Sequence, residues 1–129
     1  MPVTIKRLPD QPIIIASYSG HITVGDVLSV FTRSAEIVKP SDNTIYRISH
    51  IENTEAEFAD ILHFAQTSAS DVPGSSTDSR FHPVIVGHDK WIKLFVQFMS
   101  KKQFGGVVVP CFLTLSQALE YVQSDIAKS

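Results

Sequence analysis

The sequence is short of several features, and each shortage excludes a class of protein. Cys111 is the only cysteine among 129 residues, so neither an internal disulfide nor a zinc site built on cysteines can form. The formal net charge of −2 provides no long-range attraction for nucleic acid or an anionic membrane surface. No apolar run approaches the roughly 20 residues that span a bilayer, and the N-terminus lacks a signal peptide's apolar region. We therefore expect a soluble, cytoplasmic protein without nucleic-acid or membrane partners.

The order of apolar patterns predicts a single α/β domain over residues 1–129. Runs rich in β-branched residues alternate with stretches of helical period, in the order β-β-α-β-α-β-α-β-α. The first two strands are expected to form an antiparallel hairpin because their connection is short. The later alternation indicates right-handed βαβ units and a mostly parallel five-stranded sheet with four helices. The strands are predicted near residues 3–8, 13–17, 43–49, 83–87 and 107–112.

Capping residues predict where two of the helices begin. Thr23 with Asp26 is close to a capping box, and Thr54 with Glu57 fits the capping box proper. The second helix is expected to bury one row of side chains, namely Phe58, Ile61, Leu62 and Ala65.

The third helix carries more apolar side chains than one buried face requires. Its first row is expected to face the core and comprises Trp91, Leu94, Phe95 and Phe98. Ile92, Val96 and Met99 form a second row, and a helix with two apolar rows is either deeply buried or contacts another molecule. The second row is therefore a candidate homodimer interface. Lys90, Lys93 and Lys101 point in a third direction and are interpreted as a solvated face.

A long polar segment precedes the fourth predicted strand. Residues 67–80, "TSASDVPGSSTDSR", show no periodicity and offer little that could be buried. The segment is predicted to be a mobile loop, and a loop of this length in a compact domain commonly has a use.

Polar residues follow two predicted neighbouring strands. Ser49, His50 and Glu52 come after one strand, and His88 and Asp89 come after the next. Ligands bind at the carboxyl edge of open α/β sheets, so these five residues are a candidate polar site. The alternative is that they are solvated turn residues. Arg47, a lone charge within a strand, is expected to face solvent or to be paired.

No catalytic or cofactor motif is present. The sequence has no G-x-S-x-G elbow, no phosphate-binding glycine pattern and no pair of histidines at the i, i+4 spacing of a helical zinc site. Ser49 and His50 are adjacent on a strand, so their side chains point to opposite faces and cannot form a nucleophile–base pair. We therefore expect no enzyme activity, no metal and no cofactor.

Three stretches, taken in order, resemble the STAS/SpoIIAA-like domains. "YSGHITVGDVLSVF" is similar to the family's second strand and first helix start, and "HPVIVGHDKWIKLF" to a strand, polar turn and aromatic helix start. "QFGGVVVPCFLTLSQALEYV" is similar to its last strand and helix. The likeness covers nearly the whole chain and is closest to the uncharacterised SpoIIAA-like branch, which is related in fold to the CRAL-TRIO lipid-binding domains.

The chain departs from this family at the regulatory turn. Sporulation anti-anti-sigma factors carry Asp-Ser-[Ser/Thr]-Gly there, with the first serine phosphorylated, whereas this chain has "SHIENTEAEF". Ser49 and Thr54 are present, but the Asp-Ser pair and the glycine are absent, so the phosphorylation switch is not carried over. The resemblance implies a non-enzymatic interaction or regulatory module. Its expected partner is a second copy of the same chain, in a homodimer, or another protein. The alternative hypothesis is a carrier for a small apolar or lipid-like ligand, with the 67–80 loop as a lid.

Overall fold

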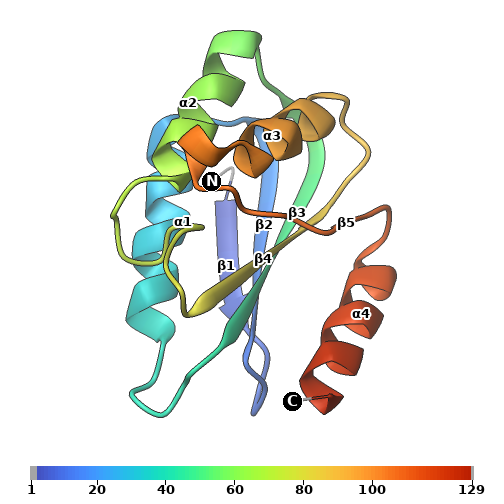
Figure 1. Ribbon diagram of the computed structural model, residues 1–129. Helices are drawn as coiled ribbons and strands as arrows, with labels where there is room; N and C mark the ends of the chain where they lie inside the picture. Colours follow the sequence, from blue (N-terminus) through green and yellow to red (C-terminus); the bar gives the residue numbers. More distant parts are fainter. Residues whose placement is uncertain (1–2, 129) are drawn as a thin grey trace.

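The computed structural model describes residues 3–128 and has the expected α/β architecture (Figure 1). Five strands and four helices follow one another in the predicted order, with one additional short 3₁₀ helix, η1. The elements are β1 (Val3–Arg7), β2 (Ile13–His21), α1 (Val24–Ile37), β3 (Ile45–Glu55), α2 (Phe58–Ser68), β4 (Phe81–Val86), α3 (Trp91–Ser100), η1 (Lys102–Phe104), β5 (Cys111–Phe112) and α4 (Leu115–Ala127).

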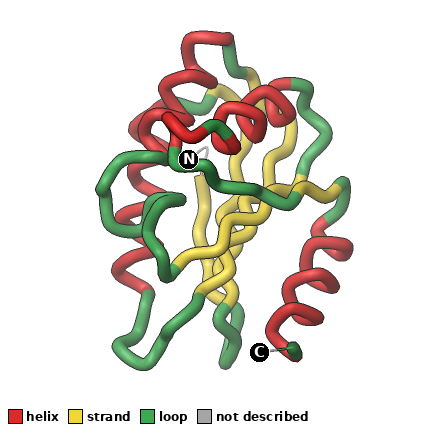
Figure 2. Tube along the Cα trace, in the orientation of Figure 1, coloured by secondary structure: helices red, strands yellow, loops and turns green. Residues whose placement is uncertain are grey.

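The sheet has the strand order β1-β2-β3-β4-β5, so each strand lies beside the one that precedes it in the chain. β1 pairs with β2 in the antiparallel sense, and the remaining neighbours are parallel. This confirms the predicted hairpin and the mostly parallel sheet. Right-handed crossovers that always advance in one direction leave their helices on the same face. Accordingly α1, α2 and α3 cover one face of the sheet and α4 covers the other (Figures 1 and 2).

This strand order removes the basis for a site at the carboxyl edge of the sheet. Ligands bind there in doubly wound folds because the strand order reverses, which opens a crevice between helices of opposite faces. Here the order of the described strands never reverses.

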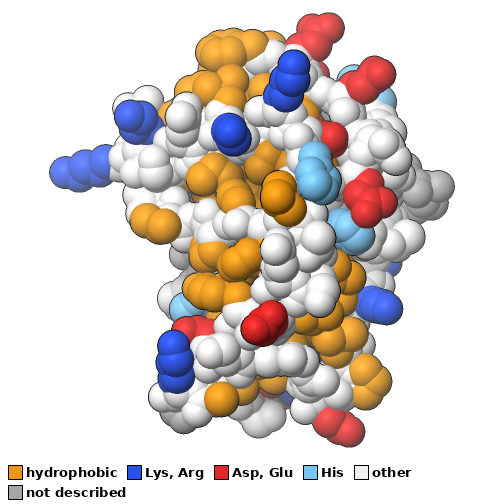
Figure 3. All heavy atoms as spheres, turned by 90° about the vertical axis from the view of Figure 1, so that its right-hand side faces the viewer, with side chains coloured by type: hydrophobic (Ala, Val, Ile, Leu, Met, Phe, Trp, Pro, Cys, Tyr) orange, Lys and Arg blue, Asp and Glu red, His pale blue; other side chains and the backbone are white. Residues whose placement is uncertain are grey.

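The two faces of the sheet bury different side chains. Ala16, Tyr18, Ile51 and Ile85 pack against α1, α2 and α3. On the other face α4 packs against a second apolar cluster, comprising Ile13, Ile15, Tyr46, Ile48, Val84 and Val86. Figure 3 views the molecule from the α4 side and shows hydrophobic side chains over much of this face, with charged ones scattered among them.

The second helix begins later than the sequence predicts. β3 continues to Glu55, so Thr54 belongs to the strand, and α2 begins at Phe58 with Glu57 as its cap and Asp60 completing the capping box. The prediction of a cap at Thr54 is wrong because other groups engage the Thr54 side chain. Phe58, predicted to face the core, is 63% exposed. The predicted box at Thr23 and Asp26 is confirmed.

Both apolar rows of α3 pack against the core, including the row predicted to form an interface. Ile92 is 5% and Met99 0% exposed, and Val96 packs against the same buried cluster. The candidate interface therefore faces the interior of this chain, and the premise of that prediction is wrong. Both rows are apolar, so periodicity could not decide which one would be buried more deeply. Trp91, Phe95 and Phe98, from the row predicted to form the core, are partly exposed and pack against the same cluster.

Candidate functional site

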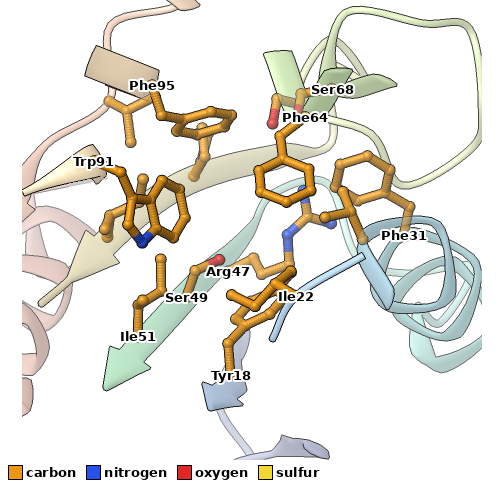
Figure 4. Close-up of a pocket in the computed structure, with 15 residues that line it drawn as sticks. Tyr18, Ile22, Phe31, Arg47, Ser49, Ile51, Phe64, Ser68, Trp91 and Phe95 are labelled. Atoms are coloured by element: carbon orange, nitrogen blue, oxygen red, sulfur yellow. The ribbon is translucent and has the colours of Figure 1, made fainter. Parts of the chain in front are cut away.

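A partly enclosed cavity of about 60 Å³ lies between the sheet and the helices α1, α2 and α3 (Figure 4). Aromatic and aliphatic side chains form most of its wall, and the few polar groups come mainly from the sheet and from the end of α2. The residues that line it are Tyr18, Ile22, Val27, Phe31, Arg47, Ser49, Ile51, Phe64, Ser68, Ser76, Pro83, Ile85, Trp91, Phe95 and Val109.

Arg47 is the only charged residue in this wall. Strand alternation places Arg47 and Ser49 on the face of β3 that α1, α2 and α3 cover, so a long cationic side chain enters the interior. Arg47 is 2% exposed. Its guanidinium carbon lies 4.8 Å from the ring centroid of Phe31 and 5.0 Å from that of Phe81. Of the two expectations for Arg47, to face solvent or to be paired, the first is wrong.

Arg47 has no acidic partner among the described residues. Its Nη1 donates a hydrogen bond to the carbonyl oxygen of Gly74, and none of the ion pairs in residues 3–128 includes it. Burial without a counter-charge lowers the pKa of Arg47 to about 10. The side chain therefore remains a cation at neutral pH.

The segment 69–80 packs closely against α1 and contributes Ser76 to the cavity wall. Gly74 has φ +87°, and a Cβ there would lie 2.1 Å from the carbonyl oxygen of Phe31. The Gly74 N–H donates to Asp78 at 2.9 Å, and Asp78 also accepts from Arg80. Ser75 is 1% exposed and donates to the carbonyl oxygen of Ser70. The prediction that this segment offers little to bury is wrong, because its small residues permit a close approach to α1.

Tyr18 and Ser49 supply hydroxyl groups beside Arg47. Burial raises the pKa of Tyr18 to about 12, which the Arg47 charge and a hydrogen bond with Ser49 only partly oppose. Tyr18 therefore keeps its proton and can donate a hydrogen bond at neutral pH. The cavity thus combines one cation and hydroxyl groups with walls that are otherwise apolar.

Trp91 is fixed in the cavity wall by the end of β3. Its Nε1 donates to the Thr54 hydroxyl at 2.9 Å, and the Thr54 hydroxyl in turn donates to Asp89. Asp89 also accepts from the Thr54 backbone N–H at 3.0 Å. The Trp91 ring contacts Phe64 and Phe95, with centroid separations of 5.9 and 6.2 Å.

The five residues of the predicted polar site do not form one cluster. Ser49 lines the cavity, whereas His50 pairs with Glu52 at 2.8 Å and alternates to the opposite face of β3. Asp89 binds Thr54, and His88 is exposed. The side chains of adjacent strand residues point to opposite faces of the sheet. For this reason Ser49 and His50, although neighbours in sequence, do not belong to one cluster.

Two classes of site find no support in the described part of the chain. No group of three or more histidine, cysteine or acidic residues in it could hold a metal ion. None of its helices is long and apolar enough to cross a membrane.

The strand order, with the helices α1 to α3 on one sheet face, is that of a SpoIIAA-like α/β fold. The structure of this chain is similar to that of an uncharacterised protein of the DUF3478 family with a SpoIIAA-like fold, from Shewanella loihica PV-4. The TM-score is 0.55 and the identity 12%, and the match covers 92% of this chain and 90% of that one. No family model and no curated protein matches the sequence. The likeness extends to the fold alone.

Proposed function

We propose that the protein is a non-enzymatic binding module that takes a small, mainly apolar molecule into the cavity between the sheet and α1 to α3. The observation that supports this most is the buried Arg47, which lies in an apolar cavity without an acidic partner. Buried charges are normally paired, so an unpaired one beside a cavity suggests a ligand.

The size of the cavity limits the ligand. Drug-sized ligands occupy pockets of about 300–1,000 Å³, whereas this cavity measures about 60 Å³. Such a volume holds about four to six water-sized groups. We therefore narrow the carrier hypothesis to a molecule of that size and do not extend it to a lipid-like one.

The alternative of a homodimeric interaction module stays a prediction. The row that suggested it, Ile92, Val96 and Met99, faces the interior. At the position of the regulatory turn, Ser49 faces the cavity and Thr54 is engaged by Asp89 and Trp91. The cavity therefore supports ligand binding better than the surface supports a switch.

The proposal is tested by filling the cavity. Ser49→Leu places an isobutyl group in it, and Ser17→Leu makes the same change on the neighbouring strand, where alternation points the side chain to the opposite sheet face. Neutral and anionic molecules of about four to six non-hydrogen atoms are titrated against the fluorescence of Trp91, the only tryptophan. We expect saturable binding in the wild type and in Ser17→Leu and its loss in Ser49→Leu. An equal response in all three proteins would disprove the proposal.

A further inference from the structure

We infer that the ligand is a small monocarboxylate whose carboxylate group pairs with Arg47 and whose apolar remainder lies against the aromatic wall. This inference rests on the proposed function and adds the chemical class of the ligand.

The geometry of the guanidinium shows where an anion can approach. A guanidinium is planar and carries its N–H donors along its edges. The rings of Phe31 and Phe81 pack against the guanidinium, with centroids 4.8 and 5.0 Å from its central carbon. One donor at an edge binds the Gly74 carbonyl oxygen. No fully buried side-chain nitrogen or oxygen in residues 3–128 lacks a hydrogen-bond partner. The Arg47 nitrogens without a partner are therefore not fully enclosed by protein atoms, and Arg47 is one of the residues that line the cavity.

The nearest acidic groups are committed to other partners. Asp78 interacts electrostatically with Arg47. It accepts hydrogen bonds from Arg80 and from the Gly74 N–H. Asp26, whose charge is felt at Tyr18, accepts from the Thr23 backbone N–H in the capping box. The cation at the cavity thus has no local carboxylate to neutralise it, and a ligand can supply one.

A carboxylate fits this environment better than a phosphate. One guanidinium balances one negative charge, and its paired N–H groups match the two oxygens of a carboxylate. A phosphate carries more charge and needs more donors than a mostly apolar wall provides, because burying an uncompensated charge is unfavourable. Tyr18 retains its proton and can donate to the same anion. Phe64, Trp91 and Phe95 then contact the apolar part (Figure 4).

The opposing interpretation is that Arg47 only anchors the 69–80 segment through Gly74. Arg47 donates to the Gly74 carbonyl oxygen under both interpretations, so the stability of the fold does not show whether Arg47 also binds a ligand. The preference between a charged and a neutral ligand of the same shape does separate them.

The experiment compares butyrate with butyramide by calorimetric titration and by Trp91 fluorescence, at constant ionic strength. The proteins are the wild type, Arg47→Gln, Arg47→Lys and the control Arg33→Gln, which removes a partly exposed arginine outside the cavity wall. We expect the wild type and Arg33→Gln to bind butyrate at least about tenfold more tightly than butyramide. Arg47→Gln loses this preference, and Arg47→Lys keeps part of it because lysine retains the charge without the paired donors.

Two results would overturn the inference, and they differ in what they leave standing. Equal binding of butyrate and butyramide in the wild type disproves the carboxylate class but leaves a small-ligand cavity. Absence of binding by either compound in a folded wild-type protein contradicts the carboxylate inference and the proposed function together.

Discussion

At the scale of single residues, Arg47 supports the proposed ligand binding but lowers the stability of the ligand-free fold. Its burial lowers its pKa to about 10, which means that the folded state disfavours the charged form at every pH below that value. The lowering corresponds to about 3 kcal/mol. The ring contacts and the bond to Gly74 offset about 2 kcal/mol of this cost.

We therefore expect Arg47→Met to stabilise the ligand-free protein by about 1 kcal/mol at neutral pH. Urea unfolding measures the free energy of unfolding, with Arg33→Met as the control for removing an arginine elsewhere. A loss of more than about 2 kcal/mol in Arg47→Met alone would show that Arg47 is a structural anchor.

A second prediction at this scale concerns Gly74, because the same substitution at Gly106 provides a control. Gly74 and Gly106 both have positive φ, but an added Cβ meets the Phe31 backbone only at Gly74, and at Gly106 it meets open space. We expect Gly106→Ala to cost about 1 kcal/mol and Gly74→Ala about 2–4 kcal/mol. Thermal and urea unfolding of both variants compare the costs, and equal losses would contradict the close approach of the 69–80 segment to α1.

At the scale of elements, the sequence pattern of α3 predicted that the helix exists but not how its two apolar rows are buried. Helical period located the helix and the predicted order of strands and helices is confirmed. How deeply each row is buried could not be predicted, because both rows of α3 are apolar and only packing against the neighbouring elements decides it. Similarly, Thr54 and Glu57 offered a cap as acceptable as the observed one, and the contacts of Thr54 with Asp89 and Trp91 are non-local.

The same limits apply to the cavity. Alternation along β3 places Arg47 and Ser49 on one face. It could not reveal that this face is covered, because the cover comes from Phe31, Phe64 and Gly74, which are distant in sequence. A lone arginine within an apolar strand was the one local signal of the site.

The burial of α3 leads to a prediction at this scale. Met99→Ala should cost about 2–5 kcal/mol because it leaves a cavity in the core, since Met99 is fully buried. Phe58→Ala removes a larger side chain that is 63% exposed and should cost less than about 1 kcal/mol. Calorimetry gives both values. Similar losses for the two variants would contradict the assignment of faces on α2 and α3.

At the scale of the whole molecule, we expect an ion pair between β1 and the segment before β3 to contribute to the pH dependence of stability. Arg7 donates to Asp42 at 2.8 and 3.0 Å, and the Lys39 backbone N–H donates to it at 2.7 Å. These bonds lower the pKa of Asp42 to about 2 from an ordinary 3.8. A lowered acid pKa stabilises the fold above the ordinary value, and this contribution is lost as the pH falls through the lowered one.

We expect Asp42→Asn to be less stable than the wild type by about 1–2 kcal/mol at neutral pH. The difference should shrink between about pH 4 and pH 2, because the wild type loses its carboxylate there. Urea unfolding over that range measures it. A constant difference across the range would contradict the assigned role of the Asp42 charge.

The most direct test of the central claim is a crystal structure of the protein grown with butyrate. The account predicts a butyrate molecule in the cavity between the sheet and α1 to α3, with its carboxylate oxygens within hydrogen-bond distance of the Arg47 guanidinium. Its apolar end should contact the aromatic wall that includes Trp91. A cavity that holds only water at saturating butyrate, with Arg47 unchanged, would contradict the claim.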